Sequence, residues 1–164
     1  MNQLKKVYIL SRLEFNDLLR INKITDENVE EKQAFFISIN ETETLNTNPK
    51  NHFNQEHTNV KIIHFDDIVD VSDISEYEKE FNAKAFTKEQ ARELIEFIIK
   101  NADKPICIVH CAAGISRSGA VGRFINDFFG GDDEFFRKTN PHIHPNSLVT
   151  RLLKEVFRNE FSKK

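Results

Sequence analysis

Short apolar runs alternate along the chain with stretches of helical periodicity. The apolar runs are rich in β-branched and aromatic residues and predict strands at residues 5–10, 34–39, 60–65 and 105–109. Helical patterns lie between these runs and after the last of them. The alternation predicts an α/β fold of three layers, in which a central, mostly parallel sheet is flanked by helices.

Two of the predicted helices begin with a capping box, in which a hydroxyl residue is followed three positions later by Glu or Gln. Ser11 and Glu14 begin a short helix that runs to about residue 19, and Thr87 and Gln90 begin a longer one that runs to residue 100. The second helix leads into the strand at 105–109. This order predicts a βαβ unit that places its parallel strands in the interior of the sheet.

Further helices are predicted after the last strand. An apolar helical pattern at residues 119–129 ends at Gly130 and Gly131, which together form a C-terminal glycine signal. Asp132 is suited to begin the next helix. A final helix is expected to begin near Pro145 and to run through residue 157, with its apolar face packed on the sheet.

Two long polar segments interrupt this pattern. Residues 40–59 contain almost no apolar residue and predict a polar loop. Residues 68–86 are acidic and irregular, and a short helix is predicted around Tyr77. Functional residues often lie in such loops, so these segments remain candidates for substrate recognition.

Length and composition limit the classes of protein to consider. The 164 residues suffice for one domain with a sizeable core, and the formal net charge of −3 gives no general attraction to nucleic acid or to anionic membranes. Two cysteines argue for a reducing compartment rather than a disulfide framework. The N-terminus has no apolar stretch long enough for a signal peptide or a membrane span. We therefore expect a cytoplasmic protein, and we expect it to be a monomer.

The sequence HCAAGISRSG, at residues 110–119, lies between the last predicted strand and the helix that follows it. The backbone N–H groups of such a loop converge at the positive end of the helix and form a cradle for an anion. Gly114 allows the backbone to turn without a Cβ. The cradle is expected to comprise Ala112, Ala113, Gly114, Ile115, Ser116 and Arg117.

Two side chains of this segment indicate its chemistry. Cys111 is expected at the floor of the cradle, where the helix N-terminus and the amide dipoles lower the pKa of a thiol below about 8.5 and give a thiolate nucleophile. Arg117 has a planar guanidinium that can bind two oxygens of a phosphoryl group. Cys107 lies between two isoleucines of the strand, so we expect it to be packed and inert.

The decapeptide resembles the phosphate-binding loop of the cysteine-based protein tyrosine phosphatases, whose signature is His-Cys, five residues, Arg, and then Ser or Thr. Every fixed position of the signature is present. The short chain is most similar to the small dual-specificity-like group. The resemblance implies one catalytic domain over residues 1–164, with the phosphate loop between a central strand and a helix. It also implies hydrolysis of phosphotyrosine in a phosphorylated protein, through a cysteinyl-phosphate intermediate and without a cofactor, with phosphoserine and phosphothreonine left open.

The resemblance also suggests roles for residues around the loop. In this family an aspartate after the strand that precedes the crossover helix acts as general acid and then as general base. That strand here ends in Asp66 and Asp67; the role is assigned to Asp67, with Asp66 as the alternative, because side chains alternate at a strand end. Ser118 is expected to assist breakdown of the thiophosphate. His110 is expected beneath the loop, where it holds backbone carbonyls and helps to keep the thiolate charged.

Other assignments stay open. Asp70, Asp73 and Glu78 are less favoured proton donors, because solvated surface charge explains them. Phosphoinositides and other non-protein esters are alternative substrates, although the uncharged variable positions of the loop argue against highly charged ligands. A pseudophosphatase that binds phosphate without cleaving the ester is a further alternative. His142 and His144 lie two residues apart with no further ligands nearby in the sequence, so we expect no metal site.

Overall fold

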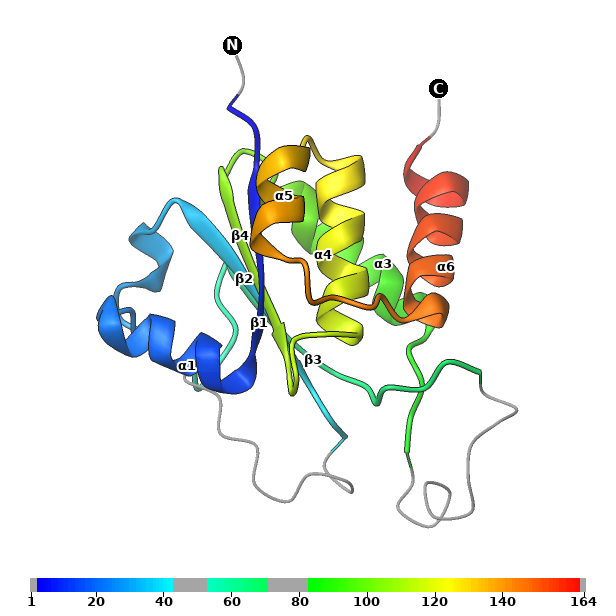
Figure 1. Cartoon of the computed structure of the whole chain (residues 1–164), viewed down its shortest axis with the longest axis horizontal. Coiled ribbons are helices and arrows are strands. Elements are labelled where there is room, and N and C mark those ends of the chain that lie inside the picture. The colour runs from blue at the N-terminus through cyan, green and yellow to red at the C-terminus, as the bar shows by residue number, and fades with distance from the viewer. Residues whose placement is uncertain (1–2, 43–52, 71–82, 163–164) are drawn as a thin grey trace.

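The computed structural model describes residues 3–42, 53–70 and 83–162, and the strands within them form one parallel sheet (Figure 1). The strand order is β1-β4-β2-β3, so that β4 pairs with β1 and β2, and β2 also pairs with β3. The strands are β1 (Lys6–Ser11), β2 (Ala34–Asn40), β3 (Val60–His64) and β4 (Ile106–Cys111). The strands predicted from the sequence are therefore confirmed, with small differences at their ends.

Helices cover both faces of the sheet. The α-helices are α1 (Arg12–Ile21), α3 (Lys88–Lys100), α4 (Arg117–Phe128), α5 (Asp133–Thr139) and α6 (Ser147–Val156). Two shorter helices are the 3₁₀-helix η1 (Val29–Glu31) and the π-helix η3 (Phe157–Phe161). One face carries α1, and the other carries α3 and α4 with α6 packed against both (Figure 1). The predicted three-layer α/β fold is confirmed. Within the described part of the chain, no helix has both the length and the apolar character to cross a membrane.

Both predicted capping boxes are present. The Ser11 hydroxyl accepts from the Glu14 backbone N–H at 3.1 Å, and the Glu14 carboxylate accepts from the Ser11 N–H at 2.8 Å. Thr87 and Gln90 make the equivalent pair of bonds at the start of α3, both at 3.1 Å. Each cap pairs backbone donors that a helix N-terminus otherwise leaves free, which stabilises the helix by about 1 kcal/mol.

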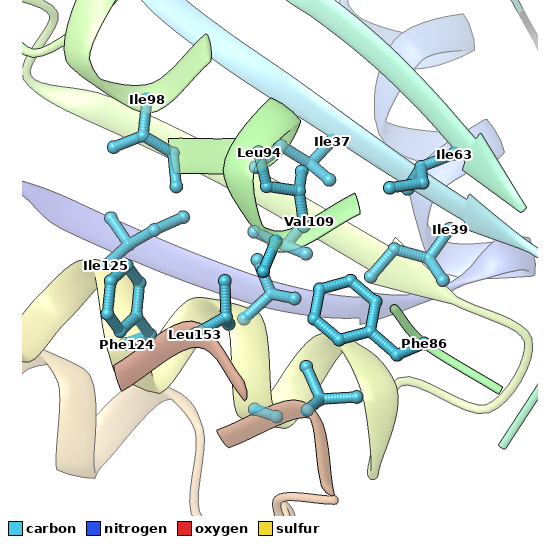
Figure 2. Close-up of a cluster of buried hydrophobic side chains, with 14 of the residues drawn as sticks. Ile37, Ile39, Ile63, Phe86, Leu94, Ile98, Val109, Phe124, Ile125 and Leu153 are labelled. Atoms are coloured by element: carbon cyan, nitrogen blue, oxygen red, sulfur yellow. The ribbon is translucent and has the colours of Figure 1, made fainter. Parts of the chain in front are cut away.

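Side chains of the strands alternate between two hydrophobic clusters, one on each face of the sheet. Ile37 and Ile39 of β2 belong to the cluster with α3, α4 and α6, whereas Phe36 belongs to the cluster with α1. Figure 2 shows Ile37 of β2, Val109 of β4 and Leu94 of α3 among the side chains of the first of these clusters. Adjacent residues of one strand therefore face opposite layers of the molecule.

The βαβ unit of β3, α3 and β4 differs from the prediction in one respect. β4 lies in the interior of the sheet, between β1 and β2, but β3 lies at its edge. The prediction is wrong for β3 because β2, which comes earlier in the chain, lies between the two strands and pairs with both. The helix predicted around Tyr77 lies outside the described residues.

Candidate active site

The alternation of side chains along β4 separates its last two residues. Cys111 belongs to the cluster that β4 shares with α4. His110 faces the other layer and stacks on Phe15 of α1, with ring centroids 4.2 Å apart. The chain then turns and enters α4 at Arg117. We call residues 111–117 the Cys111 loop; it joins an interior strand to a helix, as the sequence predicts.

The Cys111 loop packs on the carboxyl end of β1. Gly114 has a φ of +73°, and a Cβ at this position would lie 2.5 Å from both the Leu10 carbonyl carbon and the Ser11 nitrogen. The backbone N–H of Arg12 donates to the Ala112 carbonyl at 3.2 Å. Glycine is required here both for the turn and for the close approach. The other side chains of the turn are exposed or half-buried: Ala112, Ala113, Ile115 and Ser116.

The thiol of Cys111 is buried and meets several groups that stabilise its charged form. The sulfur lies 3.1 Å from the Ser118 hydroxyl and accepts from the Gly114 N–H at 3.3 Å. Burial alone raises the pKa of the thiol. The hydroxyl and backbone N–H of Ser118, the charge of Arg117 and the N–H of Gly114 outweigh burial and lower the pKa below its ordinary value. The surroundings of the sulfur therefore shift the equilibrium of the thiol toward the thiolate, as expected of a nucleophile.

Arg117 is the first residue of α4 and is only 5% exposed. Its Nη1 donates to the Phe65 carbonyl at 2.9 Å, and its Nη2 donates to the Glu41 carboxylate at 2.6 Å. The Nε–H is buried and has no hydrogen-bond partner among the described residues. The guanidinium is thus fixed at the carboxyl ends of two other strands, and its Nε–H still lacks an acceptor among the described residues.

Glu41, directly after β2, binds two arginines at once. Its Oε2 accepts from Arg117, and its Oε1 accepts from Arg12 at 2.9 Å. Sequence reasoning missed this carboxylate, because the segment 40–59 reads as a uniform polar loop. Nothing in the sequence indicates that Glu41 contacts a residue 76 positions away.

Asp66 and Asp67 have different surroundings. Asp66 is 4% exposed, and its carboxylate accepts from the N–H and hydroxyl of Thr42 at 3.2 and 2.9 Å and from the Lys84 N–H at 2.8 Å. It thereby ties the segment after β2 to the segment before α3. Asp67 is exposed and accepts from the Ser116 hydroxyl at 2.8 Å. The geometry favours Asp67 over Asp66 as a proton donor beside the Cys111 loop.

Asn146 also contacts Asp67 and was not singled out from the sequence. It is the N-cap of α6, where its Oδ1 accepts from the Val149 N–H at 3.0 Å. Its Nδ2 donates to Asp67 Oδ1 at 2.7 Å, and its backbone N–H donates to the Ser116 carbonyl at 3.0 Å. The preference of Asn for N-cap positions marks this residue as a cap. The contact with Asp67 depends on long-range packing.

His110 is fully buried and holds the backbone beneath the Cys111 loop. Its Nδ1 lies 3.2 Å from the Cys111 carbonyl oxygen, which can only accept, so Nδ1 carries the proton. Its Nε2 then accepts from the Ser38 hydroxyl at 2.6 Å. Burial lowers the pKa of the imidazole to about 4. The neutral ring adds no positive charge beside the Cys111 sulfur. Its contact with the Cys111 residue is the hydrogen bond from Nδ1 to the backbone carbonyl.

The other candidates in the described part of the chain have different surroundings. Cys107 is fully buried and unpaired, burial raises the pKa of its thiol, and it is packed as predicted. His142 contacts the Ile9 carbonyl at 3.2 Å. Among the described residues, no group of three or more His, Cys, Asp or Glu side chains is arranged to hold a metal ion. Asp70 is exposed. Two further predicted acids lie outside the described residues: Asp73 and Glu78.

No protein-family model and no curated protein sequence matches the chain. Among solved structures, it is similar to the human tyrosine phosphatase-like serine/threonine/tyrosine-interacting protein, at 18% identity over 79% of this chain and 80% of that chain, with a TM-score of 0.44. It is also similar to PTPMT1, solved in complex with PI(5)P, at 18% identity over 93% of this chain and 90% of that chain, with a TM-score of 0.47. At this identity and these TM-scores, neither structure indicates what this chain does.

Proposed function

We propose that this protein is a cysteine-dependent phosphatase that hydrolyses phosphotyrosine in proteins through a cysteinyl-phosphate intermediate. The arrangement around one sulfur atom carries the proposal. The Cys111 thiol has a lowered pKa, is followed by a turn that leads into α4, and lies within hydrogen-bond reach of Ser118. The Cys111 loop thus combines a nucleophile, backbone amides at a helix N-terminus and the cationic Arg117. Phosphoryl transfer by covalent catalysis needs this combination.

The proposed reaction has two steps. In the first, the Cys111 thiolate attacks phosphorus, an S–P bond forms, the ester P–O bond breaks, and Asp67 gives its proton to the departing oxygen. In the second, water attacks phosphorus, Asp67 takes a proton from that water, and the S–P bond breaks to return the thiolate. The Ser118 hydroxyl, 3.1 Å from the sulfur, stabilises the thiolate as it leaves.

Arg117 holds the phosphoryl group in this proposal. Its buried Nε–H has no hydrogen-bond partner among the residues that the structure describes. A buried donor without an acceptor is rare in proteins, and a phosphoryl oxygen is an acceptor well matched to a guanidinium. Together with the loop amides, Arg117 neutralises charge on the oxygens of the transferred group. The proposed chemistry needs neither a metal ion nor a cofactor.

The side chains around the cradle support an aryl phosphate monoester as substrate. The variable positions of the Cys111 loop are uncharged, and Ile115 is 38% exposed beside the cradle. An exposed apolar side chain gives the aromatic ring of a substrate a surface to pack on. The loop has no lysine side chains with which to bind a highly charged ligand. These features favour phosphotyrosine over a polyphosphorylated head group.

A substrate panel tests the proposal. Phosphate release is measured from a phosphotyrosine peptide, from the matched phosphoserine and phosphothreonine peptides, and from phosphoinositide vesicles. We expect the highest kcat/KM for phosphotyrosine and no measurable release by Cys111→Ser. Cys107→Ala is the matched control, because it removes the other thiol of the same strand and is expected to leave activity intact.

Two results would contradict the proposal. A higher kcat/KM for phosphoinositides would make the protein a lipid phosphatase. An inactive wild-type protein that still binds the phosphotyrosine peptide would make it a phosphate-binding pseudophosphatase.

A further inference from the structure

Asp67 receives two hydrogen bonds on the same carboxylate oxygen. The Ser116 hydroxyl donates to Oδ1 at 2.8 Å, and the Asn146 side-chain amide donates to Oδ1 at 2.7 Å. The other oxygen, Oδ2, has no hydrogen-bond partner within the described part of the chain. The two donors come from different elements, the Cys111 loop and the cap of α6, so they fix the carboxyl group from two sides.

Asn146 is itself held firmly. Its side chain is buried, and its Oδ1 accepts from the Val149 N–H. Its amide nitrogen donates both to Asp67 Oδ1 and, at 3.3 Å, to the Ile68 carbonyl. Two backbone bonds tie this segment to the Cys111 loop, from the Asn146 N–H to the Ser116 carbonyl and from the His144 N–H to the Ile115 carbonyl, both at 3.0 Å. The start of α6, the Cys111 loop and the segment that carries Asp67 are therefore in direct contact with one another.

We propose that Ser116 and Asn146 are positioning residues for proton transfer, an inference that rests on the proposed function. Because both donors engage Oδ1, the transferable proton is carried by Oδ2. In the first step this proton passes from Oδ2 to the ester oxygen as the P–O bond breaks, and Asp67 becomes a carboxylate whose Oδ1 keeps both hydrogen bonds. Loss of either donor leaves the acid in place but allows it to rotate, which misaligns the proton with the leaving oxygen.

The dependence of rate on the leaving group tests this inference. Asn146→Ser keeps a good helix cap but removes the amide donor, and Ser116→Ala removes the hydroxyl. Wild type and variants are compared on 4-nitrophenyl phosphate, whose phenoxide leaves readily without a proton, and on phenyl phosphate, whose phenoxide needs one. Each variant is expected to lower kcat/KM for phenyl phosphate about tenfold, and less than twofold for 4-nitrophenyl phosphate. Asp67→Asn, as the reference, is expected to give a loss of about 100-fold on phenyl phosphate.

The controls separate positioning from folding. Ser116→Thr retains a hydroxyl and is expected to restore the rate on phenyl phosphate. Asp132→Ala removes the cap of α5, which accepts from the Phe135 N–H, and is expected to lower thermal stability without changing the ratio of the two rates. Equal losses on both substrates for Asn146→Ser and Ser116→Ala would overturn the inference and leave these residues a structural role. An inactive wild type would instead overturn the proposed function.

Discussion

His110 and Cys111 are adjacent at the end of β4, and burial favours the neutral form of both side chains. For His110 burial prevails, and the pKa falls to about 4. For Cys111 burial is outweighed by the Ser118 hydrogen bonds, the charge of Arg117 and the Gly114 amide, so the charged form is favoured. The hydrogen-bond donors around each side chain, rather than its depth, therefore decide the direction in which its pKa moves toward or away from the charged form.

Replacement of Ser118 is expected to weaken the thiolate. The hydroxyl lies 3.1 Å from the sulfur and is one of the groups that lower the Cys111 pKa, so its loss is expected to raise that pKa. The rate of alkylation by iodoacetamide is measured against pH. Wild type should have its midpoint below about 8.5, the value of a free cysteine, and Ser118→Ala should shift the midpoint upward. An unchanged midpoint would show that the hydroxyl does not stabilise the thiolate.

Asp66 and Asp67 are expected to give opposite phenotypes. Asp67→Asn removes the proton donor, so kcat for phenyl phosphate should fall about 100-fold. Asp66→Asn weakens three partly buried hydrogen bonds, so it should lower the free energy of unfolding by about 2 kcal/mol with little effect on kcat. Steady-state kinetics and urea denaturation measure the two effects. The reverse ranking in kcat would move the acid to Asp66.

At the level of secondary-structure elements, local sequence patterns correctly predict those features that depend on contacts between residues close together in the chain. The capping boxes, the strand before Cys111 and the turn at Gly114 each depend on neighbouring residues, and each is found in the structure. The contacts of Glu41 and Asn146 could not be predicted from local patterns, because their partners lie far away in the chain. The edge position of β3 could not be predicted for the same reason, because strand order depends on long-range pairing.

Two glycines with positive φ provide a matched test of the Cys111 loop. Gly114 and Gly130 have φ values of +73° and +77°, so alanine brings backbone strain of about 1–2 kcal/mol at either position. At Gly130 a Cβ meets nothing within 4 Å, whereas at Gly114 it meets the backbone of Leu10 and Ser11 at 2.5 Å. Gly130→Ala should keep full activity, and Gly114→Ala should lose at least about tenfold in kcat/KM as the loop shifts. Equal activity of the two variants would contradict the proposed packing.

At the scale of the whole molecule, the site gathers at one edge of the sheet. The carboxyl ends of the four parallel strands in the described residues lead into Arg12, Glu41, Asp67 and the Cys111 loop. Parallel strands present their carboxyl ends together, and ligands of open α/β sheets bind at such an edge. The direction of the strands explains how segments far apart in the sequence come into contact with the Cys111 loop. We propose that residues 1–164 act as one catalytic domain.

An oxyanion is expected to stabilise the native protein through this site. Orthovanadate at 100 times its dissociation constant should add about 2.7 kcal/mol to the free energy of unfolding. For a chain of this length that corresponds to a rise in Tm of about 5–10 °C. Arg117→Lys keeps the charge but loses the planar fork, so its rise in Tm at the same concentration should be smaller. Equal rises measured by thermal denaturation would show that Arg117 does not hold the anion.

Detection of the covalent intermediate is the most direct test of the central claim that Cys111 is the nucleophile of a phosphatase. Wild type and Ser118→Ala are mixed with a phosphotyrosine peptide, quenched in acid within the first turnover, digested and analysed by mass spectrometry. The Cys111 peptide is expected to carry one phosphoryl group, with more of it in Ser118→Ala because breakdown is slower, and none is expected in Cys111→Ser. Phosphate release by wild type without an adduct on Cys111, together with retained activity in Cys111→Ser, would contradict the account.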